Sequence, residues 1–462
     1  MTKTSKIHFE ISERKVLLRI LDIVTVFLVL YGVGVLFVFD YFKIADDRWE
    51  WLIVLALYLS IFGTIFELYD LQKASKIDIV FKNIVLTSSL TVLFYLLTPF
   101  YTPQLPGNRL QIIYFFLAIV IALFLWRLAY ITFISSPRFY KRILIIGNSA
   151  NARIMTDAIE KSDPNYKVIG FLNTGKEMTF EDSELLEFKS NDLKKILVEN
   201  SISEIIVAGN LTKRLSIQTY NQLLDLLEKG FSIKEYTQVY EDLTQRVPVH
   251  HVDKDFYRYF PFSRSNQNKL YLFFHRIMDV VLSIIGLLIG LVIFPFILFG
   301  NLLGNRGPLL YFQERVGKNG KSFFIIKFRT MVKNAEKHGA EWSTEGDTRV
   351  TKFGRILRKS RLDEIPQFIN ILKGDMSVIG PRPERPVFVK ELSEEIPFYE
   401  IRHIIKPGLT GWAQVKSNYA ASKEDALEKL QYDLYYIKKR SVFLDINILI
   451  KTLSTILFYR GH

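Results

Sequence analysis

VVLSIIGLLIGLVIFPFILFG, residues 280–300, is an uncharged apolar run that is long enough to cross a bilayer as a helix. Pro295 interrupts this run and removes one backbone donor, and the groups that it frees must be satisfied locally in lipid. Both flanks are basic, and both therefore favour the cytoplasm: Lys269 and Arg276 lie before the run, and Arg306, Arg315, Lys318 and Lys321 lie after it. We expect a re-entrant membrane helix at about 277–304 that bends at Pro295 and returns to the side from which it entered. A kinked helix that spans the bilayer is the alternative.

The composition of the whole chain also indicates a membrane protein. Hydrophobic residues make up 49% of the 462 residues, and the mean hydropathy is +0.16, which is high for a soluble protein of several domains. The formal net charge of +13 suits anionic lipid head groups, phosphorylated substrates or nucleic acid. The lack of cysteine excludes disulfides, thiolate metal sites and cysteine nucleophiles. The N-terminal residues are too polar for a cleaved signal peptide.

Four apolar segments fill the first third of the chain, at about 16–42, 51–66, 79–100 and 110–134. The second is shorter than the ~20 residues that a spanning helix needs. The distribution of Lys and Arg among the loops places both ends of this unit in the cytoplasm. Arg19 and Asp22 lie one turn apart near the start of the first segment, where they can pair or snorkel. We expect four transmembrane helices within residues 1–137.

The middle of the chain, residues 138–265, has the pattern of a parallel α/β domain. An apolar strand at 143–146 ends at Gly147 and a helix follows, and further buried strands are expected at 166–172 and 203–210. A dinucleotide-binding turn requires GxGxxG, but only its first glycine is present here, and Asn173 stands where a ribose-binding acid is expected. We expect a Rossmann-like domain with a structural or regulatory role, and bound NAD is the less favoured alternative.

The remainder of the chain, residues 266–462, contains two adjacent acids in RLDEIPQ (361–367). The pattern predicts a helix with Asp363 at or near its N-cap, Pro366 in its first turn and Gly374 as its stop. An isolated Asp–Glu pair usually does no more than cap a helix and oppose its dipole. A carboxylate can also attack phosphorus, and a second one, here Glu364, can hold the Mg²⁺ that neutralises a diphosphate.

Several cations near these acids in the sequence are suited to gripping a diphosphate. A pair of cations on one face of a strand, or arginines held by stiff prolines, can bind phosphate oxygens with little loss of entropy. Taken singly, each is more often a solvated surface group. The candidates are Lys327 and Arg329 on one face of the predicted strand KSFFIIKFRTM, Arg361 two residues before the acids, and Arg382 and Arg385 in IGPRPERP.

Two further stretches have features of helices at a membrane interface. RVTKFGRILRKS (349–360) places apolar and basic residues on different helical faces, which suits an anionic membrane surface. The apolar stretch 441–459 contains Asp445 and Lys451, so we expect it to lie in the interface or on a core rather than to span. Packing on a soluble core is the alternative for both. In KPGLTGWAQV (406–415), Trp412 is either an interface anchor or a core aromatic.

These motifs together closely resemble the bacterial sugar transferase family, the polyprenyl-phosphate hexose-1-phosphate transferases. The resemblance covers roughly Lys269 to His462 and rests on motifs in the family's order: QERVG, GKSFFIIKFRTM, the run from RVTKFGRILRKS through RLDEIPQ to IGPRPE, KPGLTGWAQV and YDLYYIKKRS. The first part of the chain looks like that of the larger members, which have four membrane helices and a Rossmann-like domain before the catalytic domain. The fold class that this implies is a four-helix transmembrane bundle, a Rossmann-like α/β domain and an α-rich catalytic domain with a re-entrant hairpin.

The resemblance implies a reaction and roles for particular residues. A UDP-hexose, with glucose or galactose favoured, would give its sugar-1-phosphate to undecaprenyl phosphate with release of UMP, in the first membrane step of exopolysaccharide, capsule or O-antigen synthesis. Mg²⁺ is the implied cofactor. One departure from the family is Phe294, which stands where small members have a serine before the hairpin proline. By their motif positions, Asp363 would be the nucleophile, Glu364 its partner and Lys327 a further catalytic residue. The substrate phosphates would be bound by Arg329, Arg361, Arg382 and Arg385. The metal would be bound by Asp363, Glu364 and Asp433.

Other functions and partners also follow from the pattern as expectations. The main alternative is a membrane-bound nucleotide-sugar dehydratase or epimerase, for which Tyr435 and Lys439 supply the YxxxK spacing, but outside the Rossmann-like domain. A scaffold for polysaccharide assembly is the second alternative. The expected partners are UDP-hexose, undecaprenyl phosphate and the bilayer, with no nucleic acid and with a homodimer as one option. We expect a multi-pass protein of the bacterial inner membrane whose Rossmann-like and catalytic domains face the cytoplasm.

Overall fold

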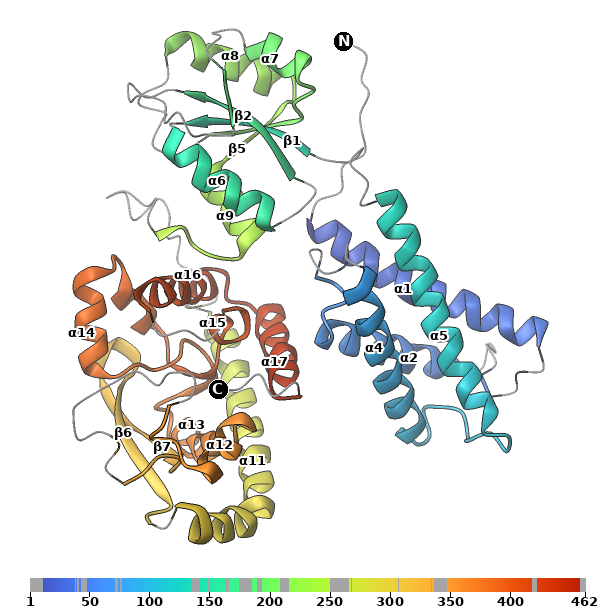
Figure 1. Cartoon of the computed structure of the whole chain (residues 1–462), viewed down its shortest axis with the longest axis vertical. Coiled ribbons are helices and arrows are strands. Elements are labelled where there is room, and N and C mark those ends of the chain that lie inside the picture. Colours follow the sequence, from blue (N-terminus) through green and yellow to red (C-terminus); the bar gives the residue numbers. More distant parts are fainter. Residues whose placement is uncertain are drawn as a thin grey trace. The chain divides into compact units, whose positions relative to one another are not determined.

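The structure is a computed structural model (Figure 1). The chain divides into two compact units, Met1–Thr244 and Gln245–His462, and each is described by itself. The predicted domain limits at 137/138 and 265/266 stay predictions, and Arg306 and the end of the predicted strand at 203–210 lie outside the described residues. The structure describes residues 11–457 except 38, 40, 43–47, 71–73, 75–76, 135–140, 148, 163–165, 174–184, 189–192, 208–215, 250–265, 267, 306, 334, 336–346 and 418–421.

The first unit begins with apolar helices that pack around a common core, as predicted. Three of them are long and apolar enough to cross a membrane, whereas α2 has only 17 residues. Leu18, Ile84 and Phe115 are fully buried in this core. The helices are α1 (Ile11–Leu36), α2 (Trp49–Ile65), α4 (Ile77–Leu97) and α5 (Leu110–Ala129), and a π-helical turn at Tyr130–Ile134 extends the last.

The ion pair inside this helix bundle differs from the local one that the sequence suggested. Asp22 accepts a hydrogen bond from Arg127 of α5 at 2.7 Å, and both side chains are buried. Arg19 instead lies over the ring of Tyr69, 4.9 Å from its centre. A buried carboxylate needs a buried counter-charge, and the exposed Arg19 on the same helix cannot supply one.

A parallel five-stranded sheet follows in the first unit and confirms the predicted α/β pattern. Its order is β3–β2–β1–β4–β5, and helices cover both faces (Figure 1). Apolar strand residues such as Ile143 and Leu144 are fully buried, as expected for strands covered on both faces. The strands are β1 (Lys141–Gly147), β2 (Tyr166–Asn173), β3 (Leu186–Phe188), β4 (Glu204–Val207) and β5 (Ser232–Glu235); the helices are α6 (Ser149–Ser162), α7 (Leu193–Glu199), α8 (Ile217–Glu228) and α9 (Tyr236–Thr244).

The second unit is organised around α11 (Lys269–Gly300), which contains Pro295 and continues as a π-helical turn at Asn301–Asn305. This helix is long and apolar enough to cross a membrane. Figure 1 shows that it changes direction in its last turns. Since Pro295 cannot donate to the preceding turn, a bend there is the expected consequence.

Glycines let the segment 353–368 of the second unit pack closely on α11. A Cβ at Gly286 would lie 2.2 Å from the ring of Phe368, and one at Gly290 would lie 2.6 Å from the side chain of Ile365. A Cβ at Gly300 would similarly lie 2.3 Å from the ring of Phe353. Small residues at four-residue spacing are a common way to bring a partner close to an apolar helix. The glycines therefore set how near α11 and the segment 353–368 approach each other.

Short strands and helices complete the second unit. Trp412 is fully buried in its core, which decides between the two roles considered for it. The last helix, α17, buries Ile448 and Asp445 but exposes Phe443 and Leu453. The elements are the antiparallel pair β6 (Leu310–Val316) and β7 (Ser322–Phe328), the parallel pair β8 (Ser377–Ile379) and β9 (Gly408–Thr410), the 3₁₀ turns η7 (Lys318–Gly320), η8 (Leu362–Glu364) and η9 (Tyr399–Ile404), and the helices α12 (Lys352–Lys359), α13 (Gln367–Lys373), α14 (Pro386–Glu395), α15 (Trp412–Lys416), α16 (Lys423–Lys439) and α17 (Val442–Leu457).

Candidate active site

The two adjacent acids lie in the 3₁₀ turn η8, between the basic helix α12 and helix α13. Arg361 adopts a left-handed conformation with φ of 57°, which turns the chain sharply after α12. On either side of the acids, Leu362 and Ile365 pack into a small apolar cluster that includes Ile297 of α11. The acids are therefore held next to the bent part of the membrane helix by the apolar residues that flank them.

Helix capping does not explain Asp363. The N-cap of α13 is Pro366, and no side chain caps this helix, so the predicted capping role of Asp363 is wrong. The physical reason is the left-handed turn at Arg361, which places the acids in a separate 3₁₀ turn before the helix begins. The predicted stop at Gly374 is confirmed, because Gly374 forms the C-cap with φ of 92°.

Three cations surround the carboxylate of Glu364. Its Oε1 atom lies 2.9 Å from Nη2 of Arg382, 3.5 Å from Nζ of Lys327 and 3.7 Å from Nη1 of Arg361. Burial alone would raise the pKa of Glu364, but the charges of these three residues outweigh it and hold the pKa well below its usual range. Glu364 is therefore a fixed anion that holds cations from β7, from the turn before η8 and from the loop that contains Arg382 at one point.

The carboxyl group of Asp363 has a different environment, although it is the next residue. Its Oδ1 atom is buried and accepts no hydrogen bond. Burial, followed by the charge of Glu364, raises the pKa of Asp363 to about 6, against the opposing charges of Lys327 and Arg358. Two adjacent carboxyl groups whose environments separate their pKa values are typical of sites that use them for different tasks. Asp363 is thus an ionisable group with an uncommitted oxygen next to a cluster of cations.

Lys327 reaches this site from β7, where its neighbour across the hairpin is Tyr311 of β6. Burial is the main influence on this amine and lowers the pKa of Lys327 to about 8, while Glu364 acts in the opposite direction. The ammonium group is therefore charged at neutral pH but titrates within a range that an activity assay can reach.

The segment that contains these acids and cations matches a known protein family. Residues 270–459 match the family model described as bacterial sugar transferase. A UDP-glucose:undecaprenyl-phosphate glucose-1-phosphate transferase of Caulobacter vibrioides is 36% identical over 187 residues, which make up 39% of this chain and 69% of that protein. The chain belongs to the bacterial sugar transferase family.

Relatives in this family differ in the sugar that their names specify. A UDP-N-acetylgalactosamine-undecaprenyl-phosphate N-acetylgalactosaminephosphotransferase of Aeromonas hydrophila is 44% identical over 222 residues, which cover 48% of this chain and 51% of that protein. A UDP-glucose:undecaprenyl-phosphate glucose-1-phosphate transferase of Xanthomonas campestris pv. campestris is 32% identical over 284 residues, which cover 59% of this chain and 55% of that protein. The chain thus spans about half the length of these two relatives.

The structure also describes contacts of Arg329 and Arg385, which the sequence singled out as ligands of the substrate phosphates. The Arg329 side chain donates to the main-chain carbonyl of Asn305 at 2.8 Å, and the Asn305 side chain donates back to the Arg329 carbonyl at 2.7 Å. Arg329 therefore ties the end of β7 to the end of the membrane segment, and its role as a ligand of the substrate phosphates stays a prediction. Arg385 lies with its guanidinium 5.8 Å from the ring centre of Phe388.

Asp433, the third predicted metal ligand, forms a buried ion pair with Arg402 at 2.7 Å. Among the residues that the structure describes, no group of three acidic or histidine side chains could hold a metal ion. The uncommitted Oδ1 atom of Asp363 does suit an oxygen-seeking ion such as Mg²⁺, which takes one or two carboxylates together with substrate phosphates. The metal role of Asp363 and Glu364 stays a prediction, and Asp433 has another partner.

The sequence reasoning did not identify Arg402, nor the role of Arg315 within QERVG. Arg315 of β6 donates to the main-chain carbonyl of Pro383 at 3.1 Å, and Arg402 of η9 donates to that of Arg382 at 3.0 Å. Both arginines therefore support the loop that carries Arg382. The available signal for Arg402 was a single cation among apolar residues just before the KPG motif, which by itself is a weak one.

Proposed function

We propose that this protein transfers hexose-1-phosphate from a UDP-sugar to undecaprenyl phosphate through a covalent intermediate on Asp363. The carboxylate of Asp363 attacks the phosphorus attached to the sugar, the bond from this phosphorus to the UMP oxygen breaks, and UMP leaves. An oxygen of undecaprenyl phosphate then attacks the same phosphorus, the acyl–phosphate bond breaks, and the Asp363 carboxylate is regenerated. The observation that carries this proposal is the uncommitted, buried oxygen of Asp363 beside Glu364, whose carboxylate holds three cations.

The surrounding residues would divide the work of this transfer. Lys327 and Arg382 offer positive charge to the diphosphate, while Glu364 keeps both of them in place before substrate arrives. Asp363 and Glu364 are the residues that would hold Mg²⁺, with substrate oxygens completing its coordination. Bound Mg²⁺ would neutralise charge on the diphosphate and on the leaving UMP.

Release of UMP tests this function directly. Purified protein with Mg²⁺, undecaprenyl phosphate and a panel of UDP-glucose, UDP-galactose and UDP-N-acetylgalactosamine should release UMP with at least one of the sugars. Glucose and galactose were favoured from the sequence, and the relatives' names add N-acetylgalactosamine to the panel. Absence of UMP with every sugar, from protein that is folded in detergent or nanodiscs, would refute the proposal.

No observation favours the dehydratase or epimerase alternative. The ring of Tyr435 stacks on that of Trp412 at 6.5 Å between ring centres, within the second unit. Its YxxxK spacing therefore lies outside the Rossmann-like sheet that would hold a dinucleotide in such an enzyme.

We further propose that α11 is re-entrant and that the catalytic unit faces the cytoplasm of the bacterial inner membrane. The basic flanks, Pro295 and the close packing of η8 on α11 support this, because UDP-sugars are cytosolic and a polyprenyl phosphate presents its phosphate at the membrane surface. The amphipathic helix α12 and the exposed apolar side chains of α17, such as Phe443, would lie at the same boundary.

Single cysteines can test this topology, because the chain contains none of its own. We expect that Lys318→Cys, after the membrane segment, is protected from a membrane-impermeant maleimide in intact cells and is labelled once the membrane is permeabilised. Asn108→Cys, in the loop between α4 and α5, is the control and should be labelled in intact cells. Labelling of Lys318→Cys in intact cells would mean that α11 spans the bilayer.

The two titratable groups with shifted pKa values predict a bell-shaped dependence of kcat/KM on pH. Asp363 must be ionised to attack, so activity should rise as the pH passes its pKa of about 6. Lys327 must be charged, so activity should fall as the pH rises past its pKa of about 8. Because these groups interact, each limb of the pH profile reports the titration of the coupled site rather than that of a single residue.

The variant Lys327→Arg isolates the basic limb of this profile. Because a guanidinium stays protonated throughout this range, the limb near pH 8 should move upward, even if the maximal rate is lower. UMP release between about pH 5 and pH 10 measures it. An unmoved basic limb in the variant would assign that limb to another group.

A further inference from the structure

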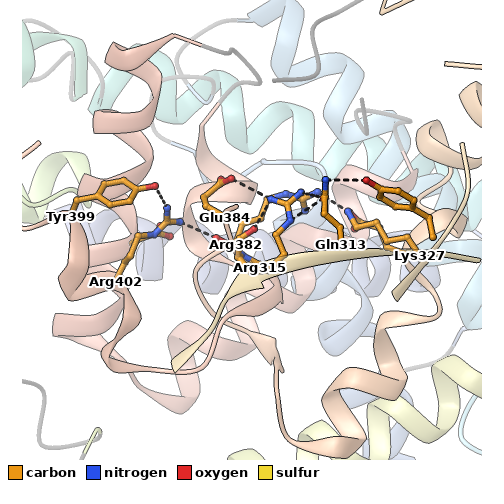
Figure 2. Close-up of polar contacts among 11 residues, drawn as sticks. Gln313, Arg315, Lys327, Arg382, Glu384, Tyr399 and Arg402 are labelled. Carbon is orange, nitrogen blue, oxygen red and sulfur yellow. Dashed lines mark hydrogen bonds and ion pairs between the residues drawn. The ribbon is translucent and has the colours of Figure 1, made fainter. Parts of the chain in front are cut away.

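The loop that carries Arg382 is held in place through the main-chain carbonyl groups of residues 381–384. Each of these four consecutive carbonyl oxygens accepts a hydrogen bond from a different donor, and two of the donors are the guanidinium groups of buried or half-buried arginines (Figure 2). The four bonds run from Gly408 N to Pro381 O (2.8 Å), Arg402 Nη2 to Arg382 O (3.0 Å), Arg315 Nη1 to Pro383 O (3.1 Å) and Val316 N to Glu384 O (2.9 Å).

Arg402 is the most constrained of these donors. Its Nη1 donates to the hydroxyl of Tyr399 at 2.6 Å, and its Nη2 donates both to the carboxylate of Asp433 at 2.7 Å and to the Arg382 carbonyl. Figure 2 shows the guanidinium between Tyr399 and the Arg382 loop. Arg402 and Asp433 are both buried, with exposures of 6% and 1%. A planar fork with three partners has little freedom to move, so it fixes the loop rather than merely touching it.

The loop in turn fixes the side chain that reaches Glu364. Arg382 is half-buried, its Nη2 lies 2.9 Å from Glu364, and its own carbonyl is the atom that Arg402 grips. A continuous chain of charge-assisted contacts therefore runs from Asp433 in α16 through Arg402 in η9 and Arg382 to Glu364 in η8. Arg382 belongs to a loop rather than to a helix or strand, so its position depends on this support and on the matching contact from Arg315.

We propose that Arg402, held by Asp433, is a positioning residue that places the Arg382 guanidinium on Glu364 and so prepares the cationic site before substrate binds. On this view Asp433 serves as the counter-ion of Arg402 and does not ligate a metal. The expected effect on UMP release rests on the proposed transferase function, whereas the expected effect on the Arg382 loop does not. Prepositioning of this kind matters because an error of about 1 Å at a reacting group can cost about 100-fold in rate.

A double-mutant cycle tests whether Arg402 acts through Arg382. We expect that Arg402→Gln lowers kcat/KM for UMP release by about 100-fold in the wild-type background and by less than about 3-fold when Arg382→Gln is already present. Equal losses in both backgrounds would show that Arg402 acts independently and would overturn the proposal. If Arg402→Gln does not fold, Asp433→Asn replaces it in the same cycle, since it keeps the size of the side chain and weakens its hold on Arg402.

The matched control is Glu428→Gln on the same helix, α16. Glu428 also pairs with an arginine, Arg246, at 3.1 Å, and this pair is more exposed than the pair of Asp433 with Arg402. We expect kcat/KM of this variant to stay within about 2-fold of wild type, as for a surface ion pair. A loss like that of Arg402→Gln would mean that any damage to α16 disturbs the site, and the proposal would fail.

Hydrogen exchange separates failure of this inference from failure of the proposed function. In Arg402→Gln, the amides of Gly408 and Val316, which donate to the loop carbonyls of Pro381 and Glu384, should exchange at least about 10-fold faster than in wild type, whether or not the protein releases UMP. Unchanged exchange would overturn the positioning role. Faster exchange in a protein that releases no UMP with any sugar would uphold the positioning role and refute the transferase function.

Discussion

Asp363→Asn is expected to abolish UMP release, with a loss of at least about 10⁴-fold, and at the same time to make the folded protein more stable. An amide cannot form the acyl phosphate, so the covalent route is lost rather than slowed. The stability gain follows from the environment of the carboxyl group, which is buried, accepts no hydrogen bond at Oδ1 and lies next to the anion of Glu364.

The sign of the stability change follows from the raised pKa. Asp363 has a pKa of about 6 in the folded chain, against an ordinary value of 3.8, so the folded state holds the proton more tightly than the unfolded state. Once the pH exceeds the folded pKa, the ionised carboxyl group therefore destabilises the fold by about 3 kcal/mol, and this penalty disappears as the pH falls below the ordinary pKa. The amide of the Asp363→Asn variant carries no charge, so thermal unfolding at about pH 7.5 should occur at a higher temperature than in wild type.

Asp445→Asn is the matched control for this result. Asp445 is another buried carboxylate in the same unit, but it accepts hydrogen bonds from Tyr271 at 2.5 Å and from Tyr436 at 2.7 Å. Burial raises the pKa of Asp445 as well, but the hydrogen bonds from both tyrosines oppose this shift. Its replacement should therefore stabilise the fold less than that of Asp363 does, and the rate should stay near that of wild type. An Asp363→Asn protein that still releases UMP would refute the covalent mechanism, and one that is less stable than wild type would refute the account of its buried oxygen.

Gly286→Leu is expected to have the largest effect on the fold of the catalytic unit. Even a Cβ at this position would lie 2.2 Å from the ring of Phe368, which stands in the first turn of α13 shortly after the acids. A leucine should therefore push α13 and η8 away from α11, with a loss of about 3 kcal/mol in stability and about 100-fold or more in UMP release. Thermal unfolding and the UMP assay measure the two effects.

Gly34→Leu provides a control with the same change in another apolar membrane helix. Among the described residues, nothing lies within 4 Å of a Cβ at Gly34 in α1, so leucine there should leave stability and activity close to wild type. Adding Phe368→Ala to Gly286→Leu should restore part of both, because it removes the ring that the leucine meets. If Gly286→Leu behaves like Gly34→Leu, the close packing of η8 and α13 on α11 does not hold the site in place.

Much of the architecture was predictable because it depends on local pattern. The run 280–300 with Pro295, the apolar helices of the first unit and the alternation of strand and helix around Gly147 all follow from periodicities and breakers that a single stretch contains. Asp363 and Glu364 were also identifiable, because their motif is contiguous and its order relative to the other motifs resembles one family. The stop of α13 at Gly374 followed from the same local logic.

The partners of the charged residues could not be predicted in this way. Asp22 pairs with Arg127, which is 105 residues away, rather than with Arg19 one turn away, and Asp433 pairs with Arg402 rather than joining Asp363. The Arg329 side chain donates to the main-chain carbonyl of Asn305, which is 24 residues away. In each case a charged side chain has been buried, and burial requires whichever counter-charge or carbonyl the fold brings near it.

The sequence by itself thus determined which segments are apolar enough for a membrane, where the α/β sheet lies and which two acids are candidates for catalysis. Only the tertiary structure decided that Asp363 is no helix cap, that Glu364 holds three cations and that Arg402 and Arg315 grip the loop of Arg382. The physical reason is the distance along the sequence over which each effect acts. Propensity and hydrophobic pattern act over a few residues, whereas desolvation and charge pairing are settled between side chains that folding brings together from distant parts of the chain.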